Sequence, residues 1–145
     1  MSGHDDRGET LLELLIAIMI IGIAVVVIVG GLVTSVLMSD IHRKQATAST
    51  AVRDYAEAIE NSVVEGSYVS CAAKTSYATG YTPPSGYTAS ITGVAYWSGT
   101  AWQPTCGTDT GLQQLTVRVA SNDNRAAEQV VIVVRKRCGL ADTLC

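Results

Sequence analysis

The sequence predicts an α+β fold in which one long N-terminal helix packs on a small antiparallel sheet of three to four strands. Two observations lead to this prediction. Residues 14 to 39 form a run of 26 uncharged residues dominated by Leu, Ile, Val and Met. Runs with the alternation typical of strands appear only in the second half of the 145-residue chain. The length leaves room for one membrane span and one small globular domain.

The uncharged run is long enough to cross a membrane. As a helix at ~1.5 Å per residue, residues 14 to 39 reach roughly 39 Å, which exceeds the ~30 Å hydrocarbon core of a bilayer. Glu13 lies within the first turn of this apolar region. A charge buried in a bilayer costs about 2.5 to 3.5 kcal/mol even on lenient insertion scales, so this carboxylate requires a partner.

The residues around Glu13 form a recognisable signature. A short charged leader and Gly8 precede Thr10-Leu11-Leu12-Glu13-Leu14-Leu15, and a long apolar helix follows. This arrangement resembles the N-terminal signature of type IV prepilins and secretion pseudopilins. The resemblance covers residues 7 to 40 closely and the remainder of the chain only in architecture.

The resemblance implies a processing site. In that family a membrane peptidase cleaves after the glycine, and the glutamate is the fifth residue of the mature chain. Counting back from Glu13 places the cleavage between Gly8 and Glu9. Mature chains of the family usually begin with Phe or Met and are N-methylated there, whereas this chain would begin, and be methylated, at Glu9.

The resemblance and the residue patterns together divide the chain into four parts. We expect a leader peptide at 1–8, a transmembrane and assembly helix at 9–39, an amphipathic continuation of the helix at 40–66 and a disulfide-stapled β domain at 67–145. The apolar stripe of the continuation recurs at steps of three, four or seven residues. Its members are Leu37, Ile41, Ala48, Val52, Tyr55, Ile59 and Val63. Gly66 is expected to cap the helix.

Strands are predicted after the helix. An uncharged stretch at 75–108, which contains Tyr77, Tyr81 and Tyr87, is expected to be mostly a loop packed over the helix, with an adhesive or carbohydrate-stacking surface as the alternative. Residues 94–97 and 100–103 are typical of a hairpin. Residues 112–120 and 129–134 are predicted strands, joined by a turn at 121–124.

Four cysteines indicate disulfide bonds in an exported domain. Cys71, Cys106, Cys138 and Cys145 are even in number and lack the close ligand spacing of zinc sites. Of the three possible connectivities, we favour the sequence-nearest pairs, Cys71 with Cys106 and Cys138 with Cys145.

The composition favours neither an enzyme nor a resident metal or cofactor. The histidines are His4, in the leader, and His42, at the membrane edge, so neither has the setting of a catalytic base. The segment 122–124, Asn-Asp-Asn, is interpreted as a turn, with a calcium site as the weaker alternative. Arg135-Lys136-Arg137 is interpreted as a solvated strand end rather than a DNA contact. Residues 40–145 carry nine basic and nine acidic side chains, so we expect no nucleic-acid partner.

Two hypotheses of function follow. The first, which the resemblance implies, is a pilin, minor pilin or pseudopilin, a structural subunit of a type IV pilus or related secretion or DNA-uptake filament. Its partners would be other pilin subunits, a prepilin peptidase, an assembly ATPase and a platform membrane protein. The second is a monomeric membrane-anchored extracytoplasmic domain that binds through its Tyr/Trp-rich surface.

The location expected for the first hypothesis is a single-pass membrane protein that later joins an extracytoplasmic filament or the cell surface. A count of positive charges flanking the span places the globular part in the cytoplasm by a margin of one charge. The cysteines and the leader signature argue for export, and we give them more weight than this small margin.

Overall fold

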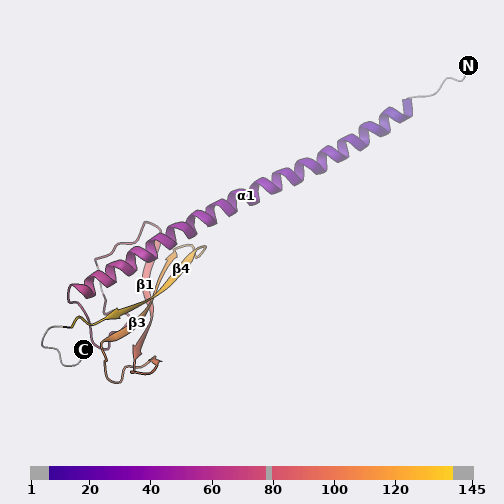
Figure 1. Ribbon diagram of the computed structural model, residues 1–145. Helices are drawn as coiled ribbons and strands as arrows, with labels where there is room; N and C mark the ends of the chain where they lie inside the picture. The colour runs from indigo at the N-terminus through magenta and orange to yellow at the C-terminus, as the bar shows by residue number, and fades with distance from the viewer. Residues whose placement is uncertain (1–6, 78–79, 139–145) are drawn as a thin grey trace, which may run out of the picture. The chain divides into compact units, whose positions relative to one another are not determined.

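The computed structural model describes residues 7–77 and 80–138, and side chains from residue 10 onwards within these ranges. The chain divides into two compact units, Met1–Asp40 and Ile41–Cys145. Helix α1 spans Arg7–Val64, and the strands are β1 (Tyr87–Trp97), β2 (Trp102–Gln103), β3 (Leu112–Ser121) and β4 (Ala127–Arg135). The strands form one antiparallel sheet in the order β2-β1-β3-β4 (Figure 1). One long helix with an antiparallel sheet of four strands agrees with the predicted α+β fold.

Most predicted boundaries agree with the structure to within a few residues. The helix begins at Arg7, slightly before the predicted start, and ends at Val64. Gly66 has a φ of 106°, and its N–H donates to the carbonyl of Val63 over 3.1 Å. A glycine adopts such a left-handed conformation without steric cost, so the predicted cap is confirmed. The hairpin is also confirmed, with Tyr96 opposite Gln103, although β2 has only two residues.

The prediction for residues 87–93 was wrong, because they belong to β1 and not to a loop. The cause is a β-bulge: Ile91 pairs with Val117 and Gly93 with Thr116, which leaves Thr92 unpaired in the ladder. The extra residue changes the phase of the strand. Ile91 and the core-facing residues after the bulge therefore do not follow one continuous alternation. For this reason the alternation typical of a strand cannot be recognised in the sequence of β1.

The core lies between the C-terminal part of α1 and one face of the sheet. Ile59 of the helix is fully buried, as are Leu115, Val117 and Val119 of β3. The buried helix residues are Ala48, Ala51, Val52, Ala56, Ile59 and Val63, with Tyr55 partly buried. The predicted stripe is thus confirmed from Ala48 to Val63. Leu37 does not belong to it, since it is 51% exposed and lies in the N-terminal unit.

Candidate functional site

The apolar part of α1 is the first candidate site. Its most apolar 18-residue window has a mean hydropathy of 3.2 and none of it is buried, and the helix is long and apolar enough to cross a membrane. Large side chains along it are open, with Leu11 70% and Val26 72% exposed. Monomeric soluble proteins rarely expose apolar patches of this size, so the exposed surface is compatible with a single membrane span.

Glu13 is the one acidic side chain in this segment. It lies exposed near the start of α1, and residues 10–39 contain no Lys, Arg or His that could pair with it. The nearest basic residues in the sequence are Arg7 and, beyond the apolar run, His42 and Arg43. A positive partner from within this segment is therefore excluded, and an apolar environment would require one from elsewhere.

The predicted cleavage site lies at the beginning of the same helix. The backbone of Gly8 and Glu9 is in the first turn of α1, and the Glu9 side chain lies outside the described residues. Cleavage after Gly8 and methylation at Glu9 stay predictions.

Of the three tyrosines singled out in the sequence, Tyr77 is buried and Tyr81 and Tyr87 are partly buried, which agrees with the packed interpretation, while the adhesive alternative stays a prediction. Tyr77 is 4% exposed. The hydroxyl of Tyr81 donates to the carbonyl of Ala51 over 3.0 Å, and that of Tyr87 to the carbonyl of Lys44 over 3.2 Å. Burial raises the pKa of both Tyr77 and Tyr81. Tyr81 and Tyr87 thus tie the segment before β1, and the start of β1, to the helix, whereas the Tyr77 hydroxyl donates to Gln113 of β3.

One of the two favoured disulfides is present. Cys71 and Cys106 are bonded, with their Cα atoms 5.6 Å apart, and the bond joins the segment after α1 to the one before β3. The Cys138–Cys145 pair lies outside the described residues, because they do not include Cys145.

Asp109 organises the polar surroundings of this disulfide. Its carboxylate accepts hydrogen bonds from the Cys71 N–H (2.8 Å), the Gly111 N–H (2.6 Å) and the Tyr68 hydroxyl (2.8 Å). Burial disfavours the charged form, but the donors outweigh it and lower the pKa of Asp109 to about 2. Gln113, which is fully buried, donates to the same carboxylate over 3.1 Å. These partners make the Asp109 carboxylate a structural anchor between the segment after α1 and β3.

The turn between β3 and β4 is tied to the helix. Asp123 forms an ion pair with Lys44 of α1 and accepts hydrogen bonds from the Ser121 hydroxyl (2.7 Å) and the Arg125 N–H (3.2 Å). The hydrogen bond from Lys44 contributes most to lowering the pKa of Asp123. These donors occupy the carboxylate, which favours the turn interpretation over a calcium site. Within residues 10–77 and 80–138, no three His, Cys, Asp or Glu side chains gather as metal ligands.

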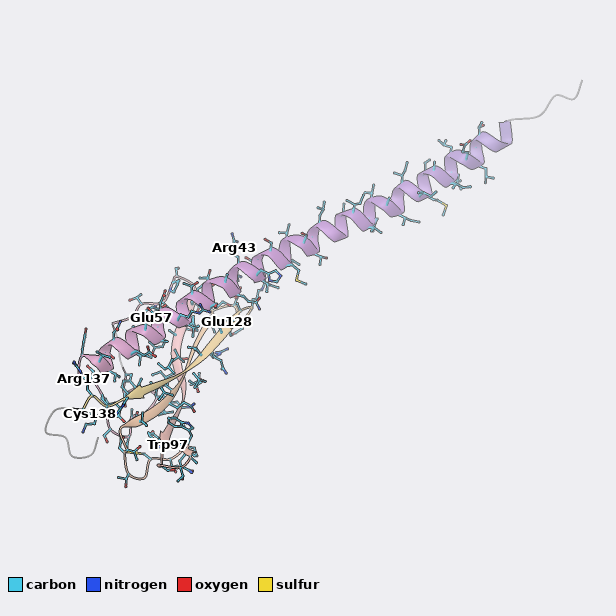
Figure 2. All side chains as sticks on the ribbon, in the orientation of Figure 1. Arg43, Glu57, Trp97, Glu128, Arg137 and Cys138 are labelled. Atoms are coloured by element: carbon cyan, nitrogen blue, oxygen red, sulfur yellow. A yellow bond between two sulfur atoms is a disulfide. The ribbon has the colours of Figure 1, made fainter. Side chains whose placement is uncertain are left out.

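The basic run after β4 also contacts the helix. Arg137 lies beside the C-terminal end of α1 (Figure 2), and its Nη1 donates to the carbonyl of Val64 over 2.9 Å. The last turn of α1 contains no basic residue of its own, so Arg137 supplies the cation that a helix C-terminus favours. Arg135, Lys136 and Arg137 are all exposed, which agrees with the solvated strand end predicted from sequence, and Arg137 makes this helix contact in addition.

Comparisons with protein-family models, curated proteins and solved structures gave no match.

Sequence reasoning missed the two polar anchors, Asp109 with Gln113 and Asp123 with Lys44. Lys44 and Asp123 are 79 positions apart, so no local pattern connects them. Buried Gln113 stands at a core-facing position of β3, where the alternation alone would place an apolar residue. That mismatch was the one signal in the sequence that pointed to a hydrogen-bond network.

Proposed function

We propose that this chain is a structural subunit, a pilin, minor pilin or pseudopilin, of a type IV pilus or a related secretion or DNA-uptake filament. A prepilin peptidase removes residues 1–8, and the subunit assembles through its N-terminal helix. An assembly ATPase and a platform membrane protein drive the assembly. The subunit is a single-pass membrane protein before it enters the filament.

One observation carries the proposal: an apolar helix that is unburied in its own chain has Glu13 near its start, four residues after the glutamate of a Gly–Glu junction. A simple membrane anchor needs the apolar residues but neither the carboxylate nor the junction. A filament subunit uses the apolar residues, the Glu13 carboxylate and the Gly–Glu junction. The helix is held in the bilayer before assembly and packs against other subunits afterwards, so its apolar surface is covered in both states.

Glu13 sets the register between subunits in this proposal. Cleavage creates an ammonium group on Glu9, and the Glu13 carboxylate of an adjacent subunit accepts it. The two charges neutralise each other inside an apolar bundle, where either alone would be costly. Leu, Ile and Val contacts supply the cohesion, and the ion pair fixes the axial position.

The mass of the mature chain tests the proposal and separates it from a monomeric membrane-anchored binding domain. The chain is purified from membranes and its N-terminal peptide is identified by mass spectrometry. A chain that begins at Glu9 is expected. A chain that begins at Met1 or Ser2 would support the anchored domain instead.

Gly8→Val provides the matched variant. The apolar run is untouched, so membrane insertion should be as in the wild type, while the bulky side chain at the scissile position should block processing. Ser2→Val, in the leader but away from the junction, is the control and should be processed normally. Removal of the leader from Gly8→Val at the wild-type rate would contradict the prepilin interpretation.

A further inference from the structure

Two hollows lie side by side on the globular unit and share Trp97 in their walls. Their volumes are about 380 Å³ and about 390 Å³. Trp97 is the last residue of β1. This end of β1 is the one farther from α1 (Figure 2). Volumes of this size fall in the range of ligand sites, which commonly combine an aromatic wall with a few polar groups.

The position of Trp97 is fixed by its neighbours. Its ring centroid lies 5.3 Å from that of Trp102 across the hairpin, with the two rings tilted by 60°. Its carbonyl accepts a hydrogen bond from the Thr110 hydroxyl over 2.7 Å. Trp97 is partly exposed, and it lines both hollows. An aromatic ring held in this way is a preorganised stacking surface.

The first hollow is cationic. Arg135 and Lys136 line it together with Trp97 and Asp109. The Asp109 carboxylate already accepts hydrogen bonds from Tyr68 and from backbone N–H groups, and Arg135 and Lys136 give this wall the positive charge that suits an acidic ligand. Arg and Lys are the side chains that recognise carboxylates.

The second hollow has a different character. No charged side chain lines it, and its polar groups are hydroxyls and one amide. They come from Ser98, Gln103, Thr105, Thr108 and Thr110. The Cys71–Cys106 disulfide fixes the wall on the side of Cys106. Such a wall suits a neutral ligand that has many hydroxyl groups.

We propose that this surface binds an acidic oligosaccharide. A carboxylated sugar ring occupies the first hollow beside Arg135 and Lys136, and a neutral sugar ring occupies the second. The apolar face of a ring stacks on Trp97 between them. A single-stranded nucleic acid fits less well, because it carries a phosphate at every nucleotide and the second hollow offers no cation. The proposal does not depend on whether the chain assembles into a filament.

The test uses the full chain in detergent and its own fluorescence. The chain has two tryptophans, Trp97 and Trp102, so Trp102→Phe leaves Trp97 as the single reporter. This variant is titrated with a glucuronyl-glucose disaccharide, with cellobiose as the matched neutral sugar and with decathymidylate. We expect a saturable signal with the acidic sugar and an affinity for cellobiose lower by about tenfold, the loss of one charge-assisted contact.

Variants then assign the binding to the proposed groups, with saturation-transfer NMR as the readout. Trp97→Ala should weaken binding of the acidic sugar by at least about tenfold, while Trp97→Phe should keep most of it. The double variant Arg135→Gln/Lys136→Gln should lose the preference for the acidic sugar and still bind cellobiose. Arg53→Gln, an exposed change on α1, is the charge control and should bind normally.

Three results would overturn the proposal, provided that each variant keeps the wild-type thermal midpoint. These are the absence of a saturable signal with either sugar, equal binding by Trp97→Ala and wild type, and tighter binding of decathymidylate than of the acidic sugar. The last result would assign the surface to nucleic acid.

Discussion

At the scale of single residues, Glu13 carries the clearest prediction. Glu13→Ala removes the acid from an apolar helix, so insertion into the membrane should be at least as good as in the wild type. In an assembled bundle it would leave the ammonium of a neighbouring subunit unpaired, at a cost of about 3 to 5 kcal/mol. Filament assembly should therefore fail while cleavage after Gly8 continues. The mature chain is measured in sheared-filament and membrane fractions.

The control for Glu13 is a second polar change in the same helix. Ser35→Ala also makes the span more apolar but leaves the proposed pair intact, so its filaments should form normally. If Glu13→Ala subunits, with no wild-type copy present, reach wild-type levels in filaments, the proposed pairing role is wrong.

Asp109 predicts a pH dependence of stability. Its pKa in the folded chain is lowered to about 2 from the ordinary value of 3.8. The folded state therefore stabilises the ionised form of the Asp109 carboxyl group relative to the unfolded state. This stabilisation is complete above the unfolded pKa and is lost as the pH falls from about 4 to about 2. Asp109→Asn should lower the thermal midpoint at neutral pH and show a smaller further loss over that acidic range.

Thermal unfolding measured between pH 2 and 7 for wild type and Asp109→Asn tests this expectation. Glu60→Gln, at an exposed position on α1, is the matched control and should follow the wild-type profile. Parallel acid profiles for wild type and Asp109→Asn would contradict the assignment of the shift to this group.

At the scale of elements, α1 has two kinds of apolar surface. Its N-terminal segment is unburied, whereas its C-terminal segment packs on the sheet. Ile59 is fully buried, so Ile59→Ala should destabilise the globular unit by about 2 to 5 kcal/mol, through lost burial and the cavity that remains. Chemical unfolding of the purified chain, followed by tryptophan fluorescence, measures the change.

Val133→Ala on β4 is the control for Ile59→Ala, because Val133 is 49% exposed on the other face of the sheet. It should cost less than about 1 kcal/mol, as surface changes usually do. Equal losses for the two variants would show that the helix does not pack on the sheet in the manner described.

At the scale of the whole molecule, the two units should respond differently to loss of the disulfide. The Cys71–Cys106 bond spans a sequence separation of 35 and lies entirely within Ile41–Cys145. The double variant Cys71→Ser/Cys106→Ser should lose about 2 to 4 kcal/mol of stability in the globular unit. Membrane insertion of the apolar segment should not change.

Limited proteolysis and carbonate extraction measure these two responses separately. The variant should be cleaved faster after residue 67 and should stay in the carbonate-resistant membrane fraction. If the variant leaves the membrane fraction, the apolar segment does not anchor the chain independently of its globular unit.

The sequence by itself determined the features that depend on neighbouring residues. A long gap between charges is sufficient to predict an apolar helix, because the cost of burying charge acts on the segment as a whole. The stripe from Ala48 to Val63 follows from the period of the helix, and the hairpin and β3 follow from turn residues and alternation. The preference for pairing the cysteines nearest in sequence also predicted the Cys71–Cys106 disulfide correctly.

Only the tertiary structure decided which polar groups meet. The bulge at Thr92 interrupts the alternation of β1, so the first half of this strand could not be read from its pattern. In the segment after α1, Cys71 donates its N–H to Asp109 and Val69 accepts a hydrogen bond from Gln113, and Asp123 accepts one from Lys44 on the helix itself. The first hollow beside Trp97 likewise combines the end of β1 with the end of β4. A local period records which face of an element is apolar, but sheet register and helix packing decide which distant side chains come within hydrogen-bonding distance.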